Sequence, residues 1–506
     1  MRKEQVVKNA GAAFIQVVAT GLLMFFLYRY LLHTIGVKRL GIWSVVLATT
    51  SASRITELGL TGSVVKFVAK YVANHDQTKA GAVIETAAIS IGVFVGALLL
   101  AVYVPLHWIL ARVLPVTAMP EATAILPYTL VSLWLATVGG VFQSGLDGCL
   151  RTDLRASFNI LNNCLTLAMA VMLVPKFGLL GLAYTQVALA GLLLLLSWIY
   201  LRTELRELPY VPHRWTVPIF KEILQYGIAF QTISFVGMLL DPITKGLLSR
   251  YGGLASAGYY EMANRMTSQF RALLTAPNQI LVPVIADLHE TESDRTLSVY
   301  KLSYRLQMFL SLPLYAGVLA AIPVVSVLWI GTYQRTFVLY SALLTLGWFL
   351  NGLINPAYFS NLGTGALKWN VIAHVVMGVS NAILGVFLGI EYGGTGVVVA
   401  RVFSLVIGSS MVIVPFFREH GLSWGELFPR ENLWLTIACA AGAGVAWFAY
   451  SSLHGDFGLI WTASACLAAF SVAISVPGWR HPMRARLFGM IPGRWWTIAV
   501  GNVGVE

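Results

Sequence analysis

Apolar stretches of about twenty residues recur along almost the whole of this 506-residue chain. A membrane-spanning helix needs about 20 consecutive, mostly apolar residues. Only 11% of the residues are charged, against about 25% in soluble globular proteins, so there are too few charges to coat a soluble surface. The sequence therefore predicts an all-α polytopic membrane protein.

We predict about fourteen transmembrane helices, with the N- and C-termini on the cytoplasmic side. They lie near 11–33, 40–64, 81–104, 124–147, 156–174, 179–201, 222–248, 256–283, 304–329, 337–359, 370–389, 395–416, 432–451 and 457–476. The first follows the basic start MRKEQVVKNA, and its apolar run is too long for a signal peptide, so we interpret it as an uncleaved span. In this topology, twenty of the 34 Lys and Arg residues fall in cytoplasmic segments, as the positive-inside rule requires.

The basic segment LRTELRELPYVPHRWTVPIFK at 201–221 is the natural boundary within the chain. We predict an N-terminal lobe of six spans at 1–205, a cytoplasmic linker at 206–221, and a second six-span lobe at 222–420. Two further spans at 421–478 and a basic cytoplasmic tail at 479–506 complete the expected organisation.

An internal repeat supports this division. Gly36, Gly41 and Arg54 have the same residue 217 positions later, at Gly253, Gly258 and Arg271. The stretch KFGLLGLAYT at 176–185 likewise resembles EYGGTGVVVA at 391–400, at a spacing of 215. Six spans separate the copies, so both run in the same direction. This predicts two lobes related by a pseudo-two-fold axis along the membrane normal, an arrangement that transporters use.

Ionisable side chains inside the predicted spans are the strongest functional signal, because such residues are costly and usually face a bundle interior or a wet cavity. In the eighth span, several polar residues recur every three or four positions, which places them on one face of a helix. That stripe comprises Glu261, Arg265, Ser268, Arg271, Thr275 and Asn278.

Two interpretations of these charges stay open. Neighbours at helical spacing could neutralise one another, as Arg54 with Glu57, Arg265 with Glu261, and Lys245 with Asp241. Alternatively, they line an aqueous cavity between the lobes that attracts an anion, and arginine suits the bidentate binding of phosphate. The second interpretation is favoured by Arg271, Arg305 and Arg401, which have no acidic residue three or four positions away.

Other classes of site are not indicated by the sequence. It has no GxxxxGK[ST] loop for ATP, no HExxH zinc motif and no GxSxG nucleophile motif. The four cysteines are scattered and form no CxxC pair. We expect no cofactor, no metal, no nucleic-acid partner and no enzymatic activity.

Two segments resemble a known family. LGIWSVV at 40–46, followed by SRITELGLTGSVVKFVAKY at 53–71, is similar to the start of bacterial polysaccharide-export flippases of the Wzx type. These belong to the multidrug/oligosaccharidyl-lipid/polysaccharide exporter superfamily. PKFGLLGLAYT at 175–185 resembles the family's turn between spans five and six. The sequence departs from the pattern at Leu40, where Tyr is usual, and at Glu57, where Asp is common.

The resemblance implies a flippase of the bacterial inner membrane that serves cell-surface polysaccharides, such as O-antigen lipopolysaccharide or exopolysaccharide. It would move an undecaprenyl-pyrophosphate-linked oligosaccharide to the outer leaflet by alternating access, near membrane lipids, a polysaccharide polymerase and glycosyltransferases. Its implied substrate-binding residues are Arg54, Arg271, Arg265, Arg305, Arg401 and Lys245, with the first two holding the pyrophosphate. Its implied ion-coupling residues are Glu57, Glu261 and Asp241.

Three alternatives remain. A lipid II flippase has the same architecture and also needs a cationic cavity. A multidrug exporter of the same superfamily would carry cations, for which buried acids without excess arginine are expected. A membrane-embedded polysaccharide polymerase or ligase would be an enzyme and would need a large outer catalytic loop, whereas the longest outer segment here spans roughly residues 105–123.

Overall fold

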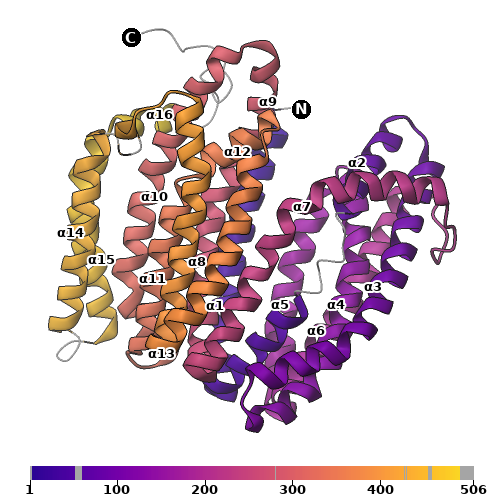
Figure 1. Cartoon of the computed structure of the whole chain (residues 1–506), viewed down its shortest axis with the longest axis horizontal. Helices are drawn as coiled ribbons and strands as arrows, with labels where there is room; N and C mark the ends of the chain where they lie inside the picture. The colour runs from indigo at the N-terminus through magenta and orange to yellow at the C-terminus, as the bar shows by residue number, and fades with distance from the viewer. Residues whose placement is uncertain are drawn as a thin grey trace. The chain divides into compact units, whose positions relative to one another are not determined.

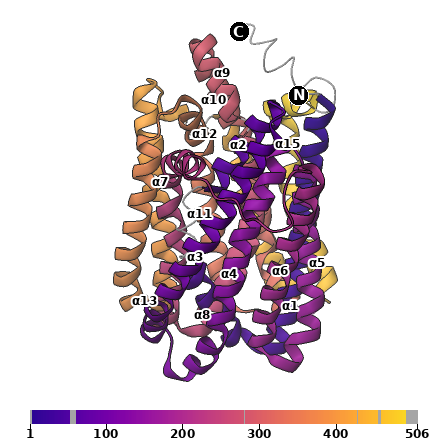
Figure 2. The same cartoon turned by 90° about the vertical axis from the view of Figure 1, so that its right-hand side faces the viewer.

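The structure is a computed structural model, which describes residues 3–51, 60–279, 281–426, 428, 430–453 and 458–490. Throughout these residues the chain is helical, with short turns between helices and no β-strand (Figures 1 and 2). This confirms the all-α membrane fold. Nine helices in the described part are long and apolar enough to cross a membrane, or ten if one bent pair is a single span. The count of fourteen therefore stays a prediction.

The described helices are α1 (Lys3–Ser51), α2 (Leu60–Ala73), α3 (Gln77–Val113), η2 (Val116–Ala118), α4 (Met119–Gly148), α5 (Thr152–Phe177), α6 (Leu179–Glu204), α7 (Val217–Leu247), η3 (Leu248–Gly252), α8 (Gly253–Asn278), α9 (Leu281–Thr291), α10 (Ser293–Ile330), α11 (Arg335–Gly352), α12 (Asn355–Thr364), α13 (Lys368–Glu419), η4 (Trp424–Glu426), η5 (Arg430–Asn432), α14 (Leu433–Leu453), α15 (Leu459–Arg480) and α16 (Pro482–Met490). They form two compact units. Unit 1 contains residues 1–262 and 381–397, and unit 2 contains 263–380 and 398–506. The lobes predicted from the repeat stay a prediction.

Helix α13 folds back on itself. A straight α-helix of its 52 residues would be about 78 Å long, whereas the hydrocarbon core of a bilayer is about 30 Å thick. Gly393, inside it, has the non-helical dihedrals φ 60° and ψ −142°. A Cβ atom on Gly396 would lie 1.9 Å from the carbonyl oxygen of Leu388. Residues eight apart are about 12 Å apart along a straight helix, so this contact requires a helical hairpin at Gly393.

The backbone shows the same repeat as the sequence. Gly36 and Gly253 share a positive φ and an extended ψ. Gly36 has φ 79° and ψ 164°, and Gly253 has φ 78° and ψ 170°. Gly178 and Gly393 share a second unusual backbone geometry. Gly178 has φ 56° and ψ −129°, and Gly393 has φ 60° and ψ −142°. L-residues with a side chain rarely adopt such positive φ values, so glycine is required at these four breaks. The predicted repeat offsets are therefore correct in three dimensions.

A further pair of glycines extends the repeat beyond the matched letters. In unit 1, a Cβ on Gly148 would lie 2.8 Å from Cβ of Val68 in α2. In unit 2, a Cβ on Gly363 would lie 2.8 Å from Cβ of Ile285 in α9. Both pairs are close helix contacts that only a glycine permits. Equivalent elements of the two copies thus make the same contact within different units.

The linker after α6 is fixed to α3 within unit 1. Glu85 is 2% exposed, and its Oε2 accepts hydrogen bonds from the backbone N–H groups of His213 and Arg214, at 2.9 and 3.0 Å. One turn further, the Trp215 indole N–H donates to Ser90 Oγ at 2.9 Å. A buried carboxylate needs such donors. The predicted linker is therefore an ordered strap that sets where α7 begins.

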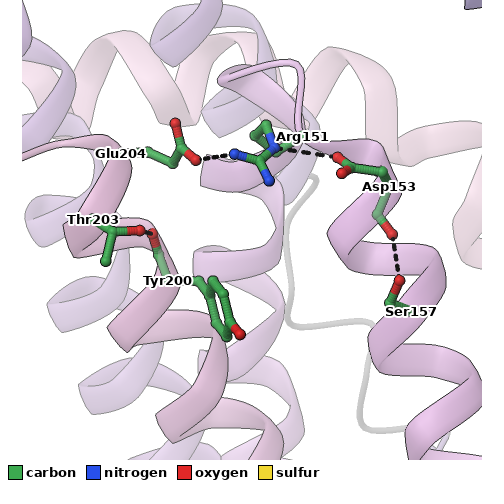
Figure 3. Close-up of polar contacts among 6 residues, drawn as sticks. All are labelled: Arg151, Asp153, Ser157, Tyr200, Thr203 and Glu204. Atoms are coloured by element: carbon green, nitrogen blue, oxygen red, sulfur yellow. Dashed lines mark hydrogen bonds and ion pairs between the residues drawn. The ribbon is translucent and has the colours of Figure 1, made fainter.

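The end of α6 is joined to the start of α5 by an ion pair (Figure 3). Arg151 lies between the carboxylates of Glu204 on α6 and Asp153 on α5, and its Nε donates to Asp153 at 3.3 Å. Burial and the nearby charge of Glu204 raise the pKa of the Cys149 thiol to about 11. That thiol stays protonated and unreactive at neutral pH, as expected for a structural cysteine.

Candidate functional site

A buried polar network in unit 1 is centred on Glu261 of α8, which is only 1% exposed. Lys245 of α7 places its Nζ 2.6 Å from Glu261 Oε2. Two hydroxyl groups of α1 also donate to this carboxylate: Tyr28 at 2.9 Å and Ser44 at 3.0 Å. All four residues are at most 6% exposed. Burial of a charge is tolerated because the charge is paired and hydrogen-bonded.

The internal repeat generates this network. Tyr28 and Lys245 are 217 positions apart, and so are Ser44 and Glu261. Equivalent positions of the two copies therefore meet in one cluster. The first copy contributes the neutral hydroxyls of Tyr28 and Ser44. The second copy has the ion pair of Lys245 and Glu261 at the equivalent positions.

Close backbone packing holds the two copies together at this point. A Cβ on Gly41 would lie 2.0 Å from the carbonyl oxygen of Leu254, and one on Gly258 would lie 2.4 Å from that of Val37. Gly41 and Gly258 are themselves repeat mates. Each lies three residues, almost one helical turn, before a member of the Ser44–Glu261 hydrogen bond. The glycine contact therefore sets the distance across which this hydrogen bond forms.

A second cluster lies within unit 2 and is cationic and aromatic. The guanidinium of Arg271, on α8, lies 4.2 Å from the ring centroid of Trp348 on α11. Arg401, on α13 and only 3% exposed, lies 5.7 Å from the same ring. Cations over an indole face are attracted by its quadrupole. Two arginines from distant parts of the sequence therefore share one tryptophan, which brings two guanidinium groups together.

Polar side chains surround this arginine–tryptophan cluster. The charge of Arg271 reaches Tyr315, Tyr358 and His374, and the His374 ring lies 3.4 Å from the Tyr358 hydroxyl. Arg271 itself is exposed, in contrast to Arg401. The arrangement offers hydroxyl and imidazole groups near the Arg271 guanidinium, which suits a ligand that carries both negative charge and hydroxyl groups.

The structure places the predicted site residues in several locations. Arg54 and Glu57 lie outside the described residues. Arg265 is exposed on α8, and Asp241 is half-buried on α7. Arg305, on α10, lies with Glu431 at 3.6 Å in a different pocket of unit 2. Sequence spacing pairs Lys245 with Asp241, but in the structure Lys245 is bound to Glu261, because partners on different helices are invisible to local spacing.

Three participants were not predicted from the sequence: Tyr28, Ser44 and Trp348. The first two could have been found by applying the 217-residue offset to Lys245 and Glu261. No offset or motif signals Trp348, since one of the 15 tryptophans of a membrane protein does not stand out by type.

Comparison with known structures supports a transporter fold. The chain is similar to the lipid II flippase MurJ in an inward closed conformation, with 13% identity, coverage of 94% of this chain and 98% of MurJ, and a TM-score of 0.69. It is similar to an inward-facing multidrug resistance MATE transporter of the MOP superfamily, with 14% identity, coverage of 81% and 98%, and a TM-score of 0.67. The chain is also similar to a MOP superfamily transporter from Pyrococcus furiosus with a binding pocket of reverse polarity. That match has 14% identity, coverage of 81% of this chain and 96% of the transporter, and a TM-score of 0.56. No curated protein matches the chain.

A family profile gives the assignment that these structures alone do not. Residues 6–289 match the family described as polysaccharide biosynthesis protein. The match covers more than half of the chain and includes α1 to α8, with the Glu261 network and Arg271. The similar solved structures are flippases and transporters rather than enzymes. The chain is a multi-pass membrane protein that belongs to the polysaccharide biosynthesis protein family.

Proposed function

We propose that the protein flips a polyprenyl-pyrophosphate-linked oligosaccharide from the cytoplasmic to the outer leaflet of the bacterial inner membrane, by alternating access. The observation that carries this proposal is the arginine–tryptophan cluster, in a chain of the polysaccharide biosynthesis family. Arg271 and Arg401 supply forked donors that match phosphate oxygens. Both guanidiniums lie near the ring of Trp348, at 4.2 and 5.7 Å from its centroid, which keeps these two positive charges close together.

Arg54 is the repeat mate of Arg271, and we propose that both hold the pyrophosphate. Arg54→Ala and Arg271→Ala should each reduce transport while the protein still inserts and folds, and lysine at either position should retain part of the activity. Full transport by the double alanine variant would contradict the paired-anchor assignment.

Glu261 is proposed as the ion-coupling residue. Its carboxylate is held by an ammonium and two hydroxyls, so a proton or a cation can replace the ammonium without leaving the oxygens unsatisfied. Release of Lys245 would then change the contact between α7 and α8. Glu261→Gln should abolish the dependence of transport on an ion gradient, whereas Glu121→Gln, which removes an exposed carboxylate paired with Arg39, should not.

The function is tested by mass spectrometry of polyprenyl-linked saccharides in cells with and without the gene. We expect a repeat-unit oligosaccharide on a pyrophosphate lipid to accumulate only in its absence, and a plasmid copy to remove it. The Arg271→Ala and Arg401→Ala copies should fail to do so. Arg335→Ala, an exposed arginine at the start of α11, is the matched control and should restore transport.

A second candidate is a lipid II flippase, which the similarity to MurJ favours. The same experiment separates the two functions, because the accumulating lipid would then carry a peptidoglycan precursor instead of a polysaccharide repeat unit. If no lipid-linked saccharide accumulates and sensitivity to cationic drugs increases, the protein is instead a multidrug exporter.

A further inference from the structure

A pocket in unit 2 lies apart from both clusters described above. It has a volume of about 240 Å³, far more than the ~10–15 Å³ that one water molecule needs. The start of α10, the end of α13 and the short helices η4 and η5 form its wall. Its lining residues are Tyr300, Lys301, Tyr304, Arg305, Phe417, Gly425, Glu426, Arg430 and Glu431.

The pocket lies where three candidate spans end. One span begins at Arg295, another ends at Glu419 and a third begins at Arg430. The first has 36 residues, about 54 Å as a helix, so it is longer than the ~30 Å hydrocarbon core and has residues to spare at its ends. The pocket therefore lies at the depth of lipid headgroups.

The charge of the pocket is positive and its ion pairs can be exchanged. Lys301 is 3.1 Å from Glu426, and Arg305 is 3.6 Å from Glu431. The basic partners are 40% and 46% exposed, and exposed pairs of this kind are weak. Arg430 also lines the pocket, so three basic side chains face two carboxylates and the net charge is positive. An anionic group can thus compete for the basic side chains at little cost.

Tyr300 supplies an independent observation. Its side chain is 2% exposed, and its hydroxyl is buried without a hydrogen-bond partner among the residues that the structure describes. The residue lines the pocket, as Glu426 does. Buried hydroxyls are nearly always hydrogen-bonded, so a ligand oxygen in the pocket suits this donor.

The neighbouring surface also fits a membrane interface. His481, between α15 and α16, stacks on Phe309, one turn beyond Arg305 on α10. Beside it, Trp479 is 69% exposed and Arg484 lies 3.9 Å from its ring. Exposed tryptophan and basic residues at the ends of spans are typical of the headgroup region.

We propose that this pocket binds the phosphate group of an anionic phospholipid, held by Arg305, Arg430 and Lys301, with the Tyr300 hydroxyl as a further donor. It is a lipid site separate from the transported cargo and does not depend on the proposed function. Basic pockets between membrane helices bind anionic headgroups by this chemistry.

The test is lipid binding to the purified full-length protein, measured by native mass spectrometry. Phosphatidylglycerol is titrated against phosphatidylcholine, and we expect the first to bind about fivefold more tightly because it carries a net charge. Arg305→Ala or Arg430→Ala should weaken phosphatidylglycerol binding about tenfold, and Tyr300→Phe about threefold, since it removes one hydrogen bond. Melting temperatures in detergent show that each variant is folded.

Arg418→Ala is the matched control, because Arg418 is exposed beside the lining residue Phe417 but does not line the pocket. Equal loss of binding in this variant, or unchanged binding in Arg305→Ala and Tyr300→Phe, would overturn the site. A third arm adds inorganic phosphate without lipid. If phosphate alone displaces the lipid at micromolar concentration, the pocket binds a free phosphate compound and the lipid assignment is wrong.

Discussion

The Glu261 network and the arginine–tryptophan cluster surround positive charge with different partners. In unit 1, Lys245 meets a carboxylate, so the charge is matched inside the protein. In unit 2, Arg271 and Arg401 meet the face of one indole, which attracts cations without neutralising them. The first arrangement is suited to exchange a small cation or a proton, and the second is suited to hold an anion.

The largest expected effect comes from breaking the matched pair. Lys245→Met removes the cation that lies 2.6 Å from the buried Glu261 carboxylate and should reduce the free energy of unfolding by about 3–5 kcal/mol. Thermal unfolding in detergent measures this change. Adding Glu261→Gln removes the carboxylate charge and should recover most of the loss. The amide keeps one acceptor oxygen for one of the Tyr28 and Ser44 hydroxyls, and its N–H can donate to the other. A double variant as unstable as Lys245→Met would show that the pair is not an isolated unit.

The cationic cluster should behave oppositely, with a loss of binding and little loss of stability. Arg271→Ala removes an exposed guanidinium and should weaken binding of the pyrophosphate cargo about tenfold to a hundredfold, as expected for charged hydrogen bonds. Binding of a short polyprenyl-pyrophosphate saccharide to the purified protein measures the effect. If Arg271→Ala lowers the free energy of unfolding but does not weaken cargo binding, Arg271 has a structural role and is not part of the ligand site.

The glycine contact should affect the first cluster alone. Gly258→Ala places a methyl group against the Val37 carbonyl and should separate α1 from α8, at a cost of about 1–3 kcal/mol. Gly444→Ala is the matched control, because a Cβ there meets no atom within 4 Å, and it should be neutral or slightly stabilising. A tolerated Gly258→Ala would mean that close approach does not set the Ser44–Glu261 distance.

Replacing Trp348 with a smaller side chain tests the arginine–tryptophan cluster with a smaller expected effect than removing an arginine. Trp348→Phe keeps a weaker ring and should reduce cargo affinity about threefold, from the ~0.5–1 kcal/mol of a cation–π contact. Trp348→Leu removes the π face and should cost more. Equal affinities for tryptophan, phenylalanine and leucine at this position would contradict the role of the ring.

The smallest effect concerns pH at the end of unit 2, outside both clusters. His481 is 4% exposed; its Nδ1 accepts from the Met483 N–H at 3.2 Å and its Nε2 lies 2.9 Å from Asn432 Oδ1, so the neutral ring is satisfied. Burial lowers the pKa of His481, with Glu431 opposing. As the pH falls, His481 is therefore protonated in the unfolded chain before it is protonated in the folded protein. The contribution of the neutral His481 to the free energy of unfolding is fully present above about pH 6.5 and decreases below it.

Melting temperatures at pH 8 and pH 5.5 test this pH dependence. His481→Gln should flatten the difference, whereas His420→Gln, at an exposed histidine of the same unit, should leave it intact. Identical pH dependence in the two variants would rule out His481 as the titrating group.

Sequence reasoning predicted what is periodic and missed what depends on long-range packing. The helical membrane fold follows from apolar stretches, and the offset of 217 predicts the matching breaks at Gly36 and Gly253. The partner of Lys245 did not follow, because Lys245 reaches Glu261 across helices instead of Asp241 on its own helix. The pairing of Arg271 and Arg401 through Trp348 joins α8, α11 and α13, and no local pattern encodes it.

The central claim is tested most directly by reconstituted flipping. Purified protein in proteoliposomes is given a labelled polyprenyl-pyrophosphate oligosaccharide, and an impermeant reagent measures how much label reaches the opposite leaflet. We predict protein-dependent transfer that Arg271→Ala and Arg401→Ala each reduce at least tenfold and Arg335→Ala leaves unchanged. Transfer at the wild-type rate in a variant that lacks both arginines would contradict the assignment of the arginine–tryptophan cluster as the cargo site.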